Sequence, residues 1–511
     1  MNATIKKFLF PTLAVCSALA LTRRLFARAT VTPALTKPDT TDGSYDAVDA
    51  YIEEQMRRLS IPGVSLAIVE GDRITHLRGF GHARPGGEAP NPQTPFFIGS
   101  ITKSFTALAV MQLVEAGKVE LDAPVQRYLP WFRVADLEAS AQMTVRHLLN
   151  QTSGLPYFPP AAAMADFYGD KADTERQVRA LANLKTNPAG ARFAYSNLNY
   201  DILGLIVEAA SGEPYAEYIH QHIFDSLEMR HSYTTKAAAQ QNGLAAGHRH
   251  WFSRPFPSSD MRIPVGSLPS GWLISSAEDM AHYLIAHLNG GRYGEAQVLS
   301  QAGIDELHRG VAEQIVFGSS VGFYGMGWFE INLDKTKTFS HGGNVPDFSA
   351  FMALIPEQKK GVVILLNADP YGLPIITEEF GMGATALLAG QQPAPARLDF
   401  VQWIARCLPL IPLLQLAGVI ATFRILRHWQ RDPVHRPSRG RMWRQQVLLP
   451  LIPNLSLAAI LAYLQSSGLI RFLQLFMPDL AWTAQISGGF AGVWAFLRTG
   501  MVLQVIRHRD E

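Results

Sequence analysis

Three apolar runs without a charged residue, close to the C-terminal end, constrain the fold of this 511-residue chain more than any other feature. Each approaches or exceeds the ~20 residues that a helix needs to cross a hydrocarbon core of ~30 Å. We therefore expect a membrane domain over residues 391–511. The runs cover residues 407–423, 447–470 and 480–497, and the predicted transmembrane helices lie near residues 404–424, 447–467 and 480–503.

The charges around these runs predict how the membrane domain is oriented. Residues 424–444, between the first two runs, carry seven arginines and one acidic residue, Asp432, and the tail ends in Arg507-His508-Arg509. Between the second and third runs only Arg471 is basic, and Asp479 balances it. By the positive-inside rule the arginine-rich loop and the tail are cytoplasmic, which places the preceding domain outside. A nucleic-acid patch is the alternative, which the flanking spans and a net charge of +2 disfavour.

The N-terminal segment has the pattern of an export signal. Two lysines precede an apolar run over residues 8–21, and small residues suitable for cleavage lie near its end. Arg23 and Arg24 directly after the run are unfavourable for cleavage, so a signal peptide and an uncleaved signal anchor both stay open for residues 1–29. A polar linker is expected over residues 30–45. An export signal delivers the next domain to the side that the arginine-rich loop predicts.

Residues 46–390 have the patterning of one globular domain of the α/β (α+β) class. Apolar, β-rich segments occur in pairs near both of its ends, and mainly helical patterns lie between them. This order predicts an antiparallel sheet built from both termini, flanked by helices and holding a helical subdomain. The two expected hairpins cover residues 64–69 with 73–80, and residues 349–355 with 361–366.

Ser100 and Lys103 are the first residues that could carry chemistry, and they lead into an apolar helical pattern. Three residues apart on a helix, they share one face, so the amine can reach the hydroxyl. The positive end of the helix dipole favours a developing oxyanion there. A lysine shielded from water can take the serine proton and make the hydroxyl a nucleophile. Taken alone, such a pair arises by chance in most chains of this length and usually means an N-cap serine with a solvated lysine.

Tyr195 and Asn197 form the second motif, just before a helix that we expect to start near Asp201. Side chains two residues apart on an extended segment point the same way, so phenol and carboxamide would face one site. A turn with a capping asparagine is the alternative.

The third motif is the run His341-Gly342-Gly343-Asn344, just ahead of the predicted strand over residues 349–355. Paired glycines let a substrate approach the backbone closely. They also occur in ordinary turns, so the run is informative only together with the other two motifs.

In this order and at these intervals the three motifs resemble those of the serine β-lactamases and penicillin-binding proteins, which are Ser-x-x-Lys, Tyr-x-Asn and a Lys/His-x-Gly strand. The resemblance covers residues 46–390 and is greatest to the class C β-lactamase and DD-peptidase branch, which includes esterases and D-aminopeptidases. It implies a β-lactamase/DD-peptidase-like fold, here followed by three transmembrane helices. Further similar segments are Leu121-Asp122-Ala123-Pro124-Val125, Thr152-Ser153-Gly154-Leu155 and Tyr324-Gly325-Met326-Gly327-Trp328.

The resemblance also implies a role for each candidate residue. Ser100 would attack a carbonyl and become acylated, while Lys103 and Tyr195 share the duties of general base and general acid. No metal and no organic cofactor is expected. The implied substrate-binding residues are Asn197, which binds the substrate amide, the strand residues His341, Gly342 and Gly343, and Asn344, whose backbone N–H completes an oxyanion hole with that of Ser100.

Two positions depart from the family pattern. His341 stands where lactamases and DD-peptidases usually carry lysine, which puts recognition of a substrate carboxylate in question. In the segment Asn150-Gln151-Thr152 relatives often have histidine before the threonine, and the sequence alone assigns no consequence to this change.

The sequence therefore predicts a multi-pass protein of the cytoplasmic (inner) membrane with an extracytoplasmic serine hydrolase domain. Its partners would be the lipid bilayer and a small-molecule or peptide substrate, cell-wall fragments included, with no nucleic acid. The substrate could be an amide, peptide, lactam or ester, and within the family a true β-lactamase or DD-carboxypeptidase is an alternative. A sensor that is acylated but never turns over is the rival from another class, although the cytoplasmic loop is too short for a signalling domain. A transporter is a second rival, but the spans lack repeated polar or broken-helix features.

Overall fold

The computed structural model describes residues 45–156, 174–258, 261, 263, 265–316, 319–394, 399–432 and 437–507. The predicted signal segment, residues 1–29, and the linker up to residue 44 lie outside these ranges.

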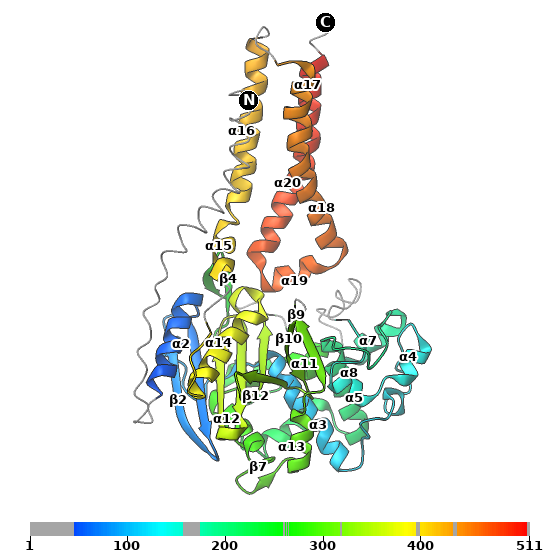
Figure 1. Ribbon diagram of the computed structural model, residues 1–511, viewed down its shortest axis with the longest axis vertical. Helices are drawn as coiled ribbons and strands as arrows, with labels where there is room; N and C mark the ends of the chain where they lie inside the picture. Colours follow the sequence, from blue (N-terminus) through cyan, green and yellow to red (C-terminus); the bar gives the residue numbers. More distant parts are fainter. Residues whose placement is uncertain are drawn as a thin grey trace. The chain divides into compact units, whose positions relative to one another are not determined.

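An antiparallel sheet of eight strands carries the first domain, in the order β2-β1-β14-β13-β12-β11-β10-β9. β1 pairs with β2 on one side and with β14 on the other, so strands from both ends of the domain lie side by side in the sheet (Figure 1). Both predicted hairpins are confirmed. The strands are β1 (Gly63–Glu70), β2 (Arg73–Gly81), β9 (Ala312–Val316), β10 (Ser319–Tyr324), β11 (Phe329–Leu333), β12 (Thr336–Val345), β13 (Phe348–Ile355) and β14 (Lys360–Leu366).

Helices cover both faces of this sheet, so its central strands are buried on both sides. On one face α14 (Pro374–Leu388) packs on β12, β13 and β14, and the backbone of Gly381 lies directly against the Phe351 ring. α2 (Asp46–Leu59) joins this layer, where its Asp49 binds His76 and Arg78 of β2. On the other face α12 (Ala277–Leu288) packs on β1 and β14.

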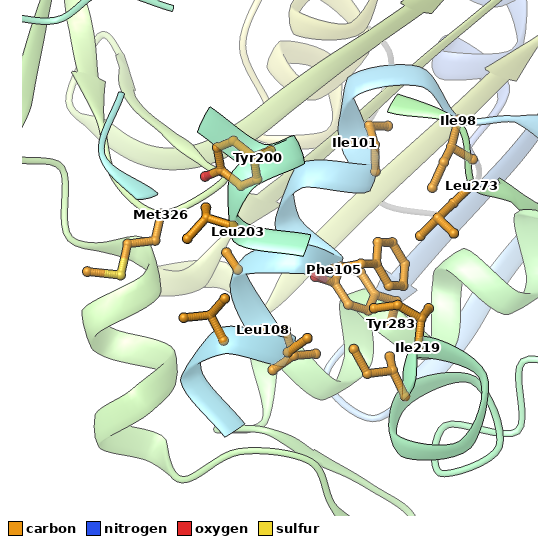
Figure 2. Close-up of a cluster of buried hydrophobic side chains, with 14 of the residues drawn as sticks. Ile98, Ile101, Phe105, Leu108, Tyr200, Leu203, Ile219, Leu273, Tyr283 and Met326 are labelled. Atoms are coloured by element: carbon orange, nitrogen blue, oxygen red, sulfur yellow. The ribbon is translucent and has the colours of Figure 1, made fainter. Parts of the chain in front are cut away.

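The helical subdomain surrounds α3 (Thr102–Glu115), which is apolar on almost every side and therefore lies in the middle of the core. Figure 2 shows its Phe105 beside Tyr283 of α12, with the two ring centroids 4.0 Å apart and stacked. Leu203 from α8 (Asn197–Ser211) and Ile219 from α9 (Tyr215–Ile219) complete the same cluster. This packing makes α3 a rigid support for the residues at its N-terminus. The other helices of the first domain are α4 (Leu137–Gln142), α5 (Val145–Leu149), α7 (Thr174–Arg179), α10 (Lys236–Gln241), α11 (Leu268–Gly271) and α13 (Gln301–His308).

Two predicted details are wrong. Ser100 lies in a 3₁₀ turn, η1 (Gly99–Ile101), that precedes α3, rather than in the first turn of the α-helix. Helix α8 begins at Asn197 and not near Asp201, because the preceding N–H of Ser196 is held by the Gln151 side chain at 2.9 Å. The glycine pair lies inside β12, which forms a hairpin with β13, so the strand that the resemblance implies for these residues is confirmed.

Three C-terminal helical segments, Val401–Arg431, Arg439–Ser466 and Pro478–Ile506, are long and apolar enough to cross a membrane. Gly468 adopts a left-handed conformation, with φ +74°, and ends the second segment inside the apolar run. Their elements are α15 (Asp399–Cys407), α16 (Leu410–Arg431), α17 (Arg439–Met442), η8 (Trp443–Leu448), α18 (Leu449–Ser466), α19 (Leu469–Phe476) and α20 (Pro478–Arg507).

One buried arginine connects these three segments. Arg498 of α20 donates to the Thr422 hydroxyl of α16 at 3.0 Å and to the Gln446 side chain of η8 at 2.8 Å. A guanidinium buried among apolar helices needs such partners, because an unpaired charge in an apolar medium is very costly. Arg498 directly follows the third apolar run, and the sequence alone does not reveal its partners.

Candidate active site

Ser100 and Lys103 meet as the sequence predicts. The 3₁₀ turn runs into α3, and the ammonium nitrogen of Lys103 lies 3.0 Å from the Ser100 hydroxyl oxygen. Gly99 has φ +55°, and a Cβ at this position would lie 2.5 Å from the backbone nitrogen of Asn344. Only glycine therefore allows β12 to approach the serine this closely.

Lys103 is fully buried and its nitrogen is held by groups from three elements. Besides Ser100, it donates to the Asn197 side-chain oxygen at 2.7 Å and to the Ser270 carbonyl oxygen at 2.5 Å. Burial lowers the pKa of Lys103 to about 7, and the charge of Asp201 opposes this change. A substantial fraction of Lys103 is thus neutral near pH 7, so the amine can accept a proton from Ser100.

Tyr195 lies close to the Lys103 nitrogen. Its ring centroid is 4.9 Å from the Lys103 nitrogen and 6.4 Å from the His341 ring. Tyr324 of β10 packs edge-on against it at 6.3 Å. Because Lys103, His341 and Tyr324 are all buried, they restrict the orientation of the Tyr195 ring.

The two glycines of β12 face opposite sides of the sheet, as alternation along a strand requires. A Cβ on Gly343 would lie 2.0 Å from the Ile98 carbonyl oxygen and 3.0 Å from the Ser100 nitrogen. A Cβ on Gly342 would instead meet the Glu378 carboxyl group of α14 at 2.3 Å. Gly343 therefore faces the serine, and Gly342 faces the helix layer behind the sheet.

Asn344 also points its side chain away from Ser100. Its amide donates to Asp369 at 2.8 Å and to the Thr377 hydroxyl at 2.9 Å. Only its backbone N–H is left on the side of the 3₁₀ turn, beside Gly99. The side chain therefore anchors the strand, while the N–H and that of Ser100 are placed to bind a developing oxyanion.

His341 faces the site as a neutral ring. Its Nδ1 lies 2.6 Å from the Gly342 carbonyl oxygen, which can only accept, so Nδ1 carries the proton. Its Nε2 then accepts from the Tyr324 hydroxyl at 3.4 Å. Burial and the nearby Lys103 lower the pKa of His341 to about 3. The imidazole therefore offers no positive charge at neutral pH.

Sequence reasoning assigned no role to three residues of this site. Asp201 stands one turn after Asn197 in α8, where a charged residue in an apolar helix is a usable signal. Gln151 stands where relatives often have histidine, and it braces the second motif by accepting from the Ser196 N–H. Ser270 touches Lys103 through its backbone, which leaves no mark in a sequence.

A possible metal site exists elsewhere in the described part of the chain. His231, Glu278 and Asp279 place one ligand atom each within 4.8 Å of one another. The Asp279 carboxylate, however, already accepts from the Ser232 hydroxyl and the His231 N–H, both at 2.7 Å. These hydrogen bonds give the Asp279 carboxylate a structural role that needs no metal ion.

A model of the β-lactamase family matches residues 48–376. "Protein flp" of Staphylococcus aureus strain MW2 is 28% identical over 346 residues, which are 66% of this chain and 66% of that protein. The chain thus spans about two thirds of the length of these curated relatives. "Penicillin-binding protein 4" of Amycolatopsis lactamdurans is 29% identical over 318 residues, 60% of this chain and 81% of that protein.

Two solved structures are similar to the chain. An octameric penicillin-binding protein homologue from Pyrococcus abyssi is 31% identical, with a TM-score of 0.58, over 68% of this chain and 78% of that one. A class C β-lactamase is 21% identical, with a TM-score of 0.57, over 67% of this chain and 96% of that one, and this likeness concerns the fold alone.

Proposed function

The chain belongs to the β-lactamase family, and on this premise we propose that it is a membrane-anchored serine hydrolase that forms an acyl-enzyme on Ser100. The observation that carries the proposal is the buried Lys103 amine, 3.0 Å from the Ser100 hydroxyl oxygen and with a pKa of about 7. An amine that is largely neutral at working pH is the base that a serine nucleophile needs.

The reaction would proceed in two steps. Neutral Lys103 takes the Ser100 proton while the oxygen attacks the substrate carbonyl, and the N–H groups of Ser100 and Asn344 bind the oxyanion. Tyr195, beside Lys103, passes the proton to the leaving group. Water then releases the acyl group with the same residues in the reverse roles. General acid–base catalysis of this kind contributes about 10²- to 10⁴-fold in rate.

We further propose that the preferred substrates are esters or D-amino-acid derivatives rather than penicillins. Lysine at position 341 would be a permanent cation for a substrate carboxylate, whereas His341 is buried and neutral. A charge-assisted hydrogen bond is worth about 1.5–3 kcal/mol, or roughly ten- to a hundredfold in kcat/KM. For esters and amides without a carboxylate, histidine instead of lysine at position 341 does not lower kcat/KM in this way.

The test uses the purified full-length protein with a penicillin, a D-Ala-D-Ala peptide, a D-amino-acid amide and a short-chain ester. We expect turnover of the ester or amide, and mass spectrometry should find the acyl group on Ser100. Ser100→Ala should abolish both labelling and turnover, and Lys103→Ala should reduce the acylation rate by at least a hundredfold. Ser104→Ala, on the same helix but away from the site, is the matched control and should still be labelled.

Three results would count against these proposals. Stable labelling of another residue contradicts the assignment of the nucleophile. Labelling of Ser100 without release of product would indicate an acylated sensor instead of a hydrolase. Penicillin hydrolysis that exceeds ester and amide turnover, or an unchanged ranking in His341→Lys, contradicts the proposed substrate class.

A further inference from the structure

Asp201 is a fully buried carboxyl group that the reaction described above does not use. It follows Asn197 by four residues on α8, so the two side chains share one face of the helix. Asn197 is hydrogen-bonded to Lys103, and Asp201 lies one turn further along the same face of α8. Its charge acts on Lys103, and that of Lys103 acts on it.

The surroundings of Asp201 give its charge little compensation. The Ser270 hydroxyl could donate to it, but it is directed at the Ser267 carbonyl oxygen, 3.1 Å away. Among the described residues, neither carboxylate oxygen of Asp201 has a hydrogen-bond partner. Burial raises the pKa of Asp201 to about 7, while Ser270 and the charge of Lys103 oppose the rise. An isolated carboxylate at such a place would cost several kcal/mol, so its ionisation depends on Lys103.

Three of the other titratable groups around the pair do not change charge near neutral pH. Tyr200 lies over Lys103 at 5.8 Å, and Tyr215 faces Asp201; burial raises the pKa of both phenols far above the usual value of 10. His341, on the β12 side, stays neutral because its pKa is lowered to about 3. Tyr195 completes the surroundings of Lys103. Asp201 is the charged group that acts on the Lys103 amine, so the charge states of the two residues are coupled.

We propose that Asp201 is a positioning residue for the hydrolase reaction, whose charge sets the fraction of Lys103 that is neutral and able to accept the Ser100 proton. This inference rests on the proposed function. An ionised Asp201 stabilises the charged amine and strengthens it as a base, whereas a neutral side chain at this position leaves a weaker base that loses its proton at lower pH. Removing the carboxylate should thus change both the pH dependence and the maximal rate.

The first test is the pH profile of Ser100 acylation in the full-length protein and in Asp201→Asn, which keeps the shape of the side chain. The acidic limb should move down by about one pH unit, and the plateau rate should fall several-fold. Asp279→Asn is the matched control, since Asp279 is equally buried but is bound by Ser232 and the His231 N–H. Its acidic limb should coincide with that of the wild type.

The second test does not need activity. ¹³C NMR of the full-length protein with labelled lysine side chains follows the titration of Lys103, assigned with Lys103→Arg. The midpoint should lie near pH 7 in the wild type and about one unit lower in Asp201→Asn and in the second neutral variant, Asp201→Ser. An unmoved midpoint in both variants overturns the role of Asp201 even if Ser100 is acylated. A moved midpoint in a protein that is never acylated supports the role and refutes the proposed function instead.

Discussion

The two adjacent glycines of β12 face different surroundings: Gly343 faces the 3₁₀ turn that carries Ser100, and Gly342 faces Glu378 of the helix layer. A methyl group on Gly343 meets two backbone atoms, the Ile98 carbonyl oxygen at 2.0 Å and the Ser100 nitrogen at 3.0 Å. Backbone atoms cannot swing away, so β12 must move from the 3₁₀ turn and the two oxyanion donors separate. Losing one such donor costs about 10²- to 10³-fold in rate. Gly343→Ala should therefore lower the rate of Ser100 acylation by at least a hundredfold.

Gly342→Ala is the matched control for this prediction. Its methyl group meets the carboxyl end of Glu378, which can rotate because it is the tip of a flexible side chain. We expect a lower melting temperature but an acylation rate within about tenfold of the wild type. Equal rates for the two alanine variants would show that the approach of β12 to Ser100 does not matter for the reaction.

At the scale of residues, a contact can be predicted from the sequence when its two residues are close along the chain. Ser100, in the 3₁₀ turn, and Lys103, in the first turn of α3, are three residues apart, so their contact follows from local geometry. Asp201 and Gln151 act on residues brought by other elements, and their roles depend on packing that no spacing encodes. The orientation of Asn344 could be predicted only as far as strand alternation allows, because its partner Asp369 lies beyond β14.

Two neighbouring helices, α12 and α13, join through a pair of neutral imidazoles. The His287 Nδ1 lies 3.0 Å from the His308 Nε2, and only one proton can occupy this contact. Burial lowers the pKa of His308 to about 3, and burial together with His308 lowers the pKa of His287 well below 6.5. Both histidines have a lower pKa in the folded state than in the unfolded state. The stability that they contribute as neutral rings is therefore complete above pH 6.5 and is lost as the pH falls toward 3.

We predict that this histidine pair makes the stability of the fold sensitive to acid. Replacing one of the two histidines should reduce that sensitivity. For one histidine with a folded pKa of about 3 and an unfolded value of about 6.5, the loss at pH 5 is about 2 kcal/mol. His308→Gln retains a nitrogen donor but cannot titrate, so its melting temperature should fall less between pH 7.5 and pH 5 than that of the wild type. His220→Gln, an exposed position, is the control. Equal pH dependence in all three proteins would contradict the prediction.

At the scale of elements, the spacing of apolar residues and the turn residues predict which elements form better than they predict where each element begins and ends. The apolar alternation and turn residues predict both hairpins. Gly117 and Gly212 follow the ends of α3 and α8, with left-handed φ values of +70° and +84°. The start of α8 is wrong by four residues because no capping side chain marks it. The distant Gln151 fixes it through the N–H of Ser196.

For the whole molecule, the predicted division is a family domain followed by three apolar helices. The family match covers residues 48–376, and the three candidate spans begin after it. Length and composition identify such spans because a helix must satisfy its own backbone hydrogen bonds in lipid. The contacts of Arg498 with Thr422 and Gln446 involve all three spans, so the bundle is held by more than apolar packing.

The distribution of arginines leads to the last prediction, the sidedness of the chain. Seven arginines and one acidic residue lie between residues 424 and 444, whereas the connection between the second and third spans carries only Arg471 and Asp479. Translocating the arginine-rich loop would be unfavourable, so we expect it in the cytoplasm and residues 46–390 outside.

Reporter fusions test this arrangement with the chain as it exists. Fusions after Gly440 and after Glu511 should give cytoplasmic signals, and a fusion after Gly390, before the first span, should give an external one. Replacing Arg424, Arg427 and Arg431 by glutamine should weaken the cytoplasmic preference at Gly440, because the retention signal is the positive charge itself. The same three replacements in the presence of three new lysines within the loop, a matched control, should restore it. An external signal at Gly440 in the unaltered chain would reverse the orientation and place Ser100 in the cytoplasm, where an export signal could not have delivered it.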